Sequence, residues 1–329
     1  MKMSRLVYGL VAGMLLSAPA LAADPIVIKF SHVVATDTPK GKAADKFKEL
    51  AERYTNNAVK VEVYPNSQLY KDKEELEALQ LGAVQMLAPS LAKFGPLGVK
   101  EFEAFDIPYI LPDKTVLRKV TNGPVGRKLL DKLESKGIKG LAYWDNGFKI
   151  MSSNKPLIKV ADFQGQKMRI QSSKVLDAQM RALGALPQVM AFSEVYQALQ
   201  TGVVDGTENP PSNMFTQKMH EVQKYATVSN HGYLGYAVIV NKAFWDGLPG
   251  EVRTNLEKAM SESTAYANMI AEEENVKSLE GIKASGKTQI HVQTAEEAAE
   301  WKKALQPVRE EMAGRVGKDL IEAFEAEAK

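Results

Sequence analysis

The chain has 329 residues, 45% hydrophobic and 25% charged, which is ordinary for a globular protein of roughly two domains at ~150 residues each. Its 42 basic and 40 acidic residues nearly balance, and this argues against a nucleic-acid partner because such partners require a basic surface. Cysteine is absent, which excludes disulfides, a thiolate nucleophile and a lipid-modified cysteine.

The first 22 residues are typical of a secretory signal peptide. Lys2 and Arg5 precede an apolar run at 6–16, and Ala-Leu-Ala at 20–22 forms a cleavage site. The apolar run is much shorter than the ~20 residues of a membrane-spanning helix. Lys2 and Arg5 account for the whole formal charge of +2, so the remaining chain is formally neutral. We expect export to a bacterial periplasm, with no membrane insertion of the mature chain.

The first half of the chain alternates strands with helices. Strands are predicted at 26–31, 59–64 and 84–88, and helices from 39 to about 54 and from 72 to 80. Asp72 suits the N-cap of the second helix because Glu75 follows three residues later. The third strand is apolar throughout, so both of its faces should be buried. This order predicts a parallel, doubly wound sheet.

The second half contains an internal repeat and a long helix. The pattern A-L-Q-x-G-x-V at 78–84 recurs at 198–204, and each copy has a helix that ends at a glycine before a strand. We interpret the copies as two related α/β units whose strand ends face one cleft, where ligands bind in open α/β sheets. A helix predicted from Pro249 to about Ala284 would be ~54 Å long, so it should run across both units.

Arg169 lies between Met168 and Ile170 on a predicted strand, so its guanidinium should be largely buried. A buried guanidinium is costly without an anion to pair with. Two interpretations are open. The anion is one of the chain's own carboxylates, which is the common fate of a buried charge, or it is a ligand carboxylate held by the bidentate fork.

Common catalytic motifs are missing. The sequence contains no G-x-S-x-G, H-E-x-x-H, Walker loop or G-x-G-x-x-G. The four histidines do not have the spacing of metal ligands. His32 is the only one that we consider a candidate site residue, because it directly follows a predicted strand. We therefore expect no catalytic residues, no cofactor and no metal site, and an enzyme is the weaker class.

Three motifs carry a family resemblance: F-x-G-x-K-x-R at 163–169, F-S-E-V-Y-x-A-L-Q at 192–200 and V-D-G-x-E-N-P at 204–210. With them, nearly the whole mature chain resembles the substrate-binding proteins of tripartite ATP-independent periplasmic (TRAP) transporters. The segments S-H-V-V at 31–34 and T-P-K-G at 38–41 most resemble the binders of four-carbon dicarboxylates.

The resemblance implies an α/β, two-lobed periplasmic binding protein fold, with lobes joined by crossing strands and by a long helix that both lobes share. The first lobe would contain residues 23–145 and about 233–265. The second lobe would contain residues 146–232 and about 266–329. The lobes should close over an organic acid.

The resemblance also implies roles for single residues. Arg169 matches the family arginine that forks onto the ligand carboxylate, and Asn209 matches the asparagine that supports the same group. Phe192 matches an aromatic residue packed over the ligand. Lys149 stands where some relatives, notably sialic-acid binders, carry a second arginine, and this departure favours a smaller acid.

Two further residues are assigned from position and charge alone. Lys40 and Ser90 lie on loops at strand ends of the first lobe, where they would suit the far end of the ligand. Two lysines would then accompany Arg169, and three cations around one carboxylate would leave buried charge uncompensated. We therefore expect a ligand with a carboxylate at each end, the second of which meets Lys40 or Lys149.

The leading hypothesis is a periplasmic receptor that binds a small organic acid and delivers it to the membrane subunits of a TRAP transporter. A four-carbon dicarboxylate such as malate, succinate or fumarate is the expected ligand. Other carboxylates, namely a 2-oxo acid, a sugar acid or an aromatic acid, are alternatives. So is a periplasmic enzyme or a sensor that acts on a small acid.

Overall fold

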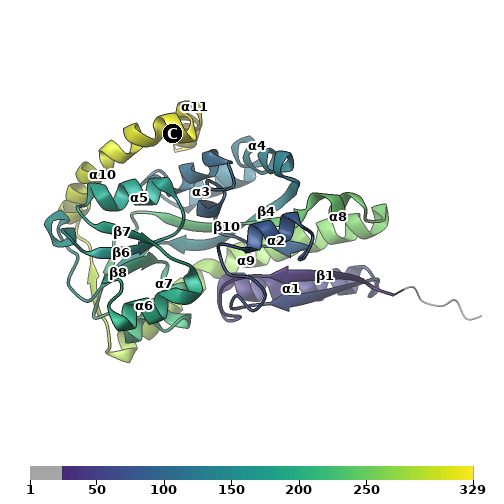
Figure 1. The fold of residues 1–329 in the computed structure, drawn as a ribbon, viewed down its shortest axis with the longest axis horizontal. Helices are drawn as coiled ribbons and strands as arrows, with labels where there is room; N and C mark the ends of the chain where they lie inside the picture. Colours follow the sequence, from purple (N-terminus) through teal and green to yellow (C-terminus); the bar gives the residue numbers. More distant parts are fainter. Residues whose placement is uncertain (1–23, 329) are drawn as a thin grey trace, which may run out of the picture.

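The computed structural model describes residues 24–328, so the predicted signal peptide lies outside the described residues. Two separate sheets divide this part of the chain into two lobes, as the two-lobed α/β prediction requires (Figure 1). The segments β4 to β5, β9 to β10 and the helix α9 run between them.

The first sheet has the strand order β2-β1-β3-β10-β4. Its strands are β1 (Ile26–Ser31), β2 (Val59–Tyr64), β3 (Met86–Leu87), β4 (Ile138–Phe148) and β10 (Tyr233–Asn241). The predicted parallel pairing holds for the first three strands, but β10 runs antiparallel to both β3 and β4. The sheet is mixed because the chain leaves this lobe along β4 and returns along β10 in the opposite direction.

The second sheet has the order β11-β9-β5-β8-β6-β7 and is also mixed. Its strands are β5 (Ile150–Ser153), β6 (Lys167–Ile170), β7 (Leu186–Val189), β8 (Gly206–Asn209), β9 (Tyr225–Val228) and β11 (Gln289–Val292). β6 lies beside β8, so Arg169 and Asn209 sit on neighbouring strands.

Helices and 3₁₀ turns cover the sheets. The first lobe has α1 (Pro39–Tyr54), α2 (Glu75–Gln80), α3 (Lys114–Asn122), α4 (Pro124–Lys132), α8 (Lys242–Asp246), η1 (Leu91–Lys93), η2 (Lys100–Asp106) and η3 (Leu133–Lys136). The second has α5 (Lys174–Ala182), α6 (Val195–Thr201), α7 (Pro211–Thr216), η4 (Val160–Phe163), η5 (Phe192–Glu194) and η6 (Met219–Glu221).

The internal repeat is visible in the backbone. Gly82 and Gly202 both adopt left-handed φ angles, of 76° and 73°; Gly82 is the second residue after α2 and Gly202 is the first after α6. The predicted N-cap of α2 is wrong, because the helix begins only at Glu75 and no side chain caps it. The carboxylate of Asp72 makes its contacts in the cleft instead, as described below.

The long helix α9 (Gly250–Ser285) has 36 residues, close to the predicted extent. It contacts α1 and β4 of the first lobe and α7 of the second, so it crosses both lobes as expected (Figure 1). Its interior-facing residues join the aromatic core of Phe30, Phe47 and Trp144 under the first sheet. None of the described helices is long and apolar enough to span a membrane.

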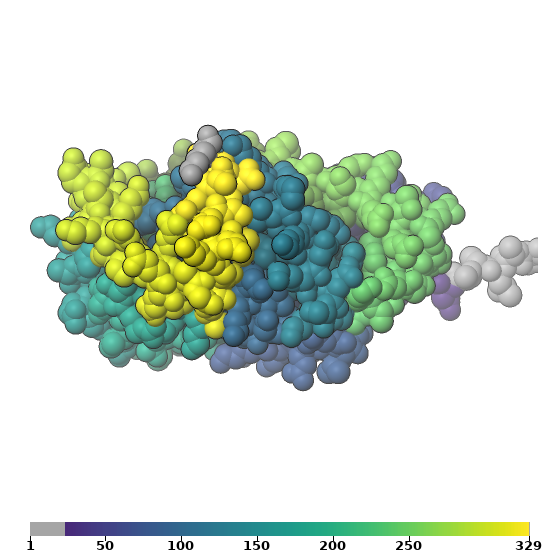
Figure 2. Space-filling view, turned by 90° about the horizontal axis from the view of Figure 1, so that it is seen from above, coloured from purple at the N-terminus to yellow at the C-terminus, as the bar shows by residue number. Residues whose placement is uncertain are grey.

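The chain ends in two helices that touch both lobes. α10 (Ala295–Val316) packs on α5 and on η2, and α11 (Lys318–Ala326) packs on α4 and η2. An ion pair between Arg315 and Glu103 fixes this crossing. Figure 2 shows α11, in yellow, against the blue surface of the first lobe. α11 belongs to the range 266–329 that we expect in the second lobe, and it contacts α4 and η2.

Candidate functional site

A small cavity of about 270 Å³, which includes space open to solvent, lies between the lobes. Four of the predicted site residues line it: Lys40, Ser90, Phe192 and Asn209. Arg169 lines an adjoining hollow of about 240 Å³, which shares Asp72, Lys93 and Gln171 with the cavity. Residues from both lobes are thus brought together.

Lys40 presents a buried cation to the cavity. Thr38 caps α1 by accepting from the N–H of Gly41, and Pro39 occupies the first helical turn, which positions Lys40 at the start of the helix. Its Nζ donates to the Ala88 carbonyl at 2.9 Å and lies 3.7 Å from the ring centroid of Tyr236. Among the described residues, no carboxylate lies within ion-pair distance of it. Burial lowers the pKa of Lys40 to about 7, and Glu75 opposes this shift.

Arg169 is 2% exposed on β6. Its Nε and one terminal nitrogen donate to the Met190 carbonyl at 3.0 and 2.9 Å. That terminal nitrogen is 4.0 Å from Asp72 Oδ2, while the guanidinium carbon lies 5.8 Å from the ring centroid of Phe192. Both interpretations from the sequence thus retain support, since an internal carboxylate is near but does not form the bidentate pair.

Sequence reasoning missed a buried triad in which Lys93 pairs with both Asp72 and Glu75. Asp72 also accepts from the backbone N–H of Phe192, which belongs to the other lobe. Burial acts to raise the pKa of Asp72, but the Lys93 and Arg169 cations hold it below its usual value. Burial raises the pKa of Glu75, whose carboxylate has only Lys93 within ion-pair distance among the described residues.

A local signal for Lys93 existed. It lies at the end of the turn that Ser90 caps by accepting from the Ala92 N–H, so it emerges beside a predicted site residue. Asp72 gave no such signal, because the charged run 71–75 resembles a solvated helix face. Ser90 Oγ also donates to Gln171 Oε1 at 3.2 Å, across the cleft.

Lys149 does not line the cavity. Its Nζ lies 2.6 Å from Glu208 Oε1, and the other oxygen of Glu208 contacts His231 and Gln179, each at 2.8 Å. Although burial opposes it, Lys149 and His231 hold the pKa of Glu208 well below its usual range. Glu208 therefore already neutralises Lys149, which leaves Lys40 as the lysine facing the cavity without an internal carboxylate.

The two other predicted residues differ in placement. Asn209 ends β8 with its side chain at the cavity, where Nδ2 lies 3.4 Å from Thr207 Oγ1. His32 is 1% exposed but does not line the cavity. Burial, together with the nearby Lys40 cation, lowers the pKa of His32 to about 3, so the ring is neutral.

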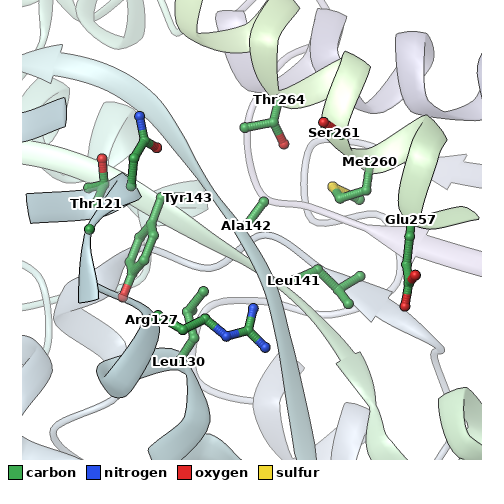
Figure 3. Close-up of a pocket in the computed structure, with 12 residues that line it drawn as sticks. Thr121, Arg127, Leu130, Leu141, Ala142, Tyr143, Glu257, Met260, Ser261 and Thr264 are labelled. Carbon is green, nitrogen blue, oxygen red and sulfur yellow. The ribbon is translucent and has the colours of Figure 1, made fainter. Parts of the chain in front are cut away.

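A wider hollow of about 830 Å³ lies elsewhere, between α4, β4 and α9 (Figure 3). Several of its polar groups are already engaged. Tyr143 donates to the Gly126 carbonyl, Arg127 pairs with Asp131, and Thr264 accepts from Trp144. The buried cations that an organic acid requires are absent from its lining, so the interlobe cavity is the candidate site.

Two α/β lobes that enclose a small cavity with buried cations define a solute-binding protein. Residues 30–315 match the model of the DctP family, bacterial extracellular solute-binding proteins of family 7, and the chain belongs to this family. A relative from Rhodobacter capsulatus, a C4-dicarboxylate-binding periplasmic protein, is 75% identical over 94% of this chain and 93% of its own length.

Two solved structures are similar over most of the chain. A TRAP periplasmic solute-binding protein from Shewanella oneidensis with bound succinate has a TM-score of 0.91 and 43% identity, covering 93% of this chain and all of its own. A counterpart from Pseudomonas aeruginosa with bound L-malate has a TM-score of 0.85 and 45% identity, covering 87% of this chain and all of its own.

Proposed function

We propose that this protein is a periplasmic receptor that binds a four-carbon dicarboxylate in the interlobe cavity and delivers it to the membrane subunits of a TRAP transporter. The observation that carries the proposal is Lys40, a buried cation that faces the cavity without an internal carboxylate partner. Arg169 would hold one ligand carboxylate, with Asn209 and Phe192 beside it. Lys40 and Ser90 would meet the other.

Charge at the site supports a dianion. Lys40, Lys93 and Arg169 surround the two hollows, whereas only Asp72 and Glu75 oppose them. One positive charge therefore stays uncompensated, which is costly when buried. A ligand with two carboxylates can pair with Lys40, which has no ion pair among the described residues, and with Arg169, whose nearest carboxylate, Asp72, lies 4.0 Å away. The similar proteins with bound succinate and L-malate are 43% and 45% identical, whereas a sugar-acid binder with bound galactonate is 31% identical.

Export and transport complete the proposal. The segment 1–22 acts as a cleaved signal peptide, and the mature protein carries its ligand unchanged. An enzyme would alter the acid instead. Recovery of succinate unaltered after prolonged incubation, checked by NMR, separates the two functions, and a chemically altered acid would contradict the receptor.

Calorimetric titration tests the ligand class. Succinate or malate should bind at least ~30-fold more tightly than butyrate, because butyrate keeps the chain length but leaves one buried cation unpaired. If butyrate bound as well as succinate, the dicarboxylate proposal would fail.

Variants test the two ends of the site. Arg169→Ala should weaken succinate binding by ~2–5 kcal/mol, the usual cost of truncating one partner of a buried charge pair. Arg181→Ala, an exposed arginine on α5, is the matched control. Lys40→Met should remove most of the preference for succinate over butyrate, whereas Lys46→Met on the exposed face of α1 should leave it intact. A twofold effect or less at Arg169 would contradict its assignment.

A further inference from the structure

Asn213 places an unpaired acceptor at the cavity. It lies in the first turn of α7, is 2% exposed and lines the same cavity as Lys40 and Asn209. Its Oδ1 is buried and receives no hydrogen bond from any described residue. No other polar side-chain atom of the cavity lining shares this property within residues 24–328.

Tyr236 lines the same cavity as Asn213, and burial raises the pKa of its hydroxyl. Asn146 Nδ2 lies 3.0 Å from the same hydroxyl.

The surrounding contacts hold this arrangement in place. Ser212, the preceding residue, donates through Oγ to Asn146 Oδ1 at 2.9 Å, and its backbone N–H donates to Asn275 Oδ1 at 2.9 Å. Asn275 lies on α9, so the start of α7 is tied to the helix that both lobes share. A group fixed in this way loses little entropy when it binds a ligand atom.

An unpaired acceptor is a mismatch for a plain diacid. Succinate as a dianion carries only acceptors, so it cannot donate to Asn213 Oδ1, and the buried oxygen keeps its desolvation cost. A hydroxyl group on a middle carbon of the ligand can donate to it. The neighbouring cations Lys40 and Lys93 are donors only, so they cannot serve as the acceptor for such a hydroxyl.

We propose that Asn213 is a specificity-determining residue that accepts a hydrogen bond from the hydroxyl of a 2-hydroxy dicarboxylate. This inference rests on the proposed function, and within the four-carbon dicarboxylates it ranks hydroxylated diacids such as malate above succinate. Because the acceptor lies on one side of the cavity, one enantiomer of malate should be favoured over the other.

The test compares ligands that differ at one group. Calorimetry with succinate, 2-methylsuccinate and each enantiomer of malate separates the hydroxyl from its volume, since a methyl group replaces it in 2-methylsuccinate. One enantiomer of malate should bind about tenfold more tightly than either enantiomer of 2-methylsuccinate, the usual scale of one hydrogen bond that satisfies a buried acceptor. Equal affinities for malate and 2-methylsuccinate in the wild-type protein would overturn the inference.

Two variants assign the effect to Asn213. Asn213→Leu should remove the preference for malate over 2-methylsuccinate, whereas Asn213→Asp should keep the preference, because it keeps the acceptor, while weakening all dianions. A malate preference that persists in Asn213→Leu, or disappears in Asn213→Asp, contradicts the assignment. If no diacid binds the wild-type protein, the proposed function itself fails, which is a different outcome from equal binding of all of them.

Discussion

Several charged residues at this site are almost fully buried, and burial disfavours the charged form of each side chain. Lys40 is the clearest case, since a carbonyl and an aromatic ring solvate its ammonium group less well than water does. The titratable and charged groups around it are Glu75, Asp72, Lys93 and His32. A ligand dianion that enters the cavity would strongly favour the charged form of Lys40.

We therefore expect dicarboxylate binding to take up a proton. In the empty cavity, Lys40 has a pKa of about 7 and is mostly neutral above that value; beside a dianion its pKa rises toward the ordinary 10.5, so it is charged in the complex. The proton is taken up above pH 7, and the dissociation constant should rise with pH by up to about tenfold per unit.

Calorimetry at pH 8 in buffers with different ionisation enthalpies measures this uptake. Fumarate is the probe of choice, because both of its carboxyl groups are ionised over this range. Lys40→Arg should bind without proton uptake, since arginine stays charged at both stages. Binding of fumarate by the wild-type protein with no dependence on the buffer would contradict this prediction.

The sequence predicts the surroundings of some of these residues and not of others. Lys40 and Ser90 follow predicted strands of one lobe, and the structure brings both to the cavity. Lys149 is predicted from charge and from a resemblance, but its pairing with Glu208 depends on the contact between β5 and β8, which a linear pattern does not reveal. Asn213 carries no charge and matches no motif, so the sequence does not identify it as a site residue. Only the structure does, because its buried Oδ1 has no hydrogen-bond partner among the described residues.

At the scale of elements, the turn η1 and the loop before α2 form one electrostatic unit. Lys93 on η1 pairs with both Asp72 and Glu75, and it is the only described cation within ion-pair distance of Glu75. Asp72 does not cap α2 for this reason, since its carboxylate is more strongly attracted to a buried ammonium group than to the N–H groups of a short helix. The sequence pattern of a helix N-cap does not show that a distant lysine will pair with the capping carboxylate.

Removal of Lys93 should therefore destabilise the whole protein. We expect Lys93→Met to lower the free energy of unfolding by ~3–5 kcal/mol, because the substitution leaves the buried Glu75 without an ion pair and leaves Asp72 with only Arg169, 4.0 Å away. Urea denaturation measures this change. Lys60→Met, which removes an exposed pair with Glu62 on β2, is the control and should cost less than ~1 kcal/mol. Equal stability of the two variants would show that the triad is not a structural unit.

At the scale of the whole molecule, contacts across the cleft hold the lobes together. Ser90 reaches Gln171, Lys71 lies 3.1 Å from Glu194, and Asp72 accepts from Phe192. A ligand that joins Arg169 to Lys40 would strengthen the same closure. Small-angle scattering should then show a smaller radius of gyration with saturating succinate than without it.

The scattering experiment needs protein that is free of ligand. Unfolding and refolding remove any co-purified acid before the measurement. An unchanged radius of gyration in protein prepared this way would contradict closure by the ligand.

The sequence predicts those parts of the fold that depend on a local sequence pattern or on the internal repeat. The alternation of strands and helices, the glycine within each copy of the repeat and the length of α9 are all present in the sequence and in the structure. The antiparallel return of β10 and the docking of α11 on α4 depend on contacts between distant segments. Neither leaves a periodic pattern, so the sequence did not indicate them.

The closed cavity also constrains the kinetics of exchange. Phe192, Asn209 and Tyr236 are all nearly inaccessible to solvent, so we expect a bound molecule to leave only when the lobes part. The dissociation rate is then bounded by the rate at which the lobes part, whatever the strength of the individual contacts. Two ligands of different affinity could share similar residence times if both wait for the same opening. A partner that pulls the lobes apart would accelerate the release of every ligand alike.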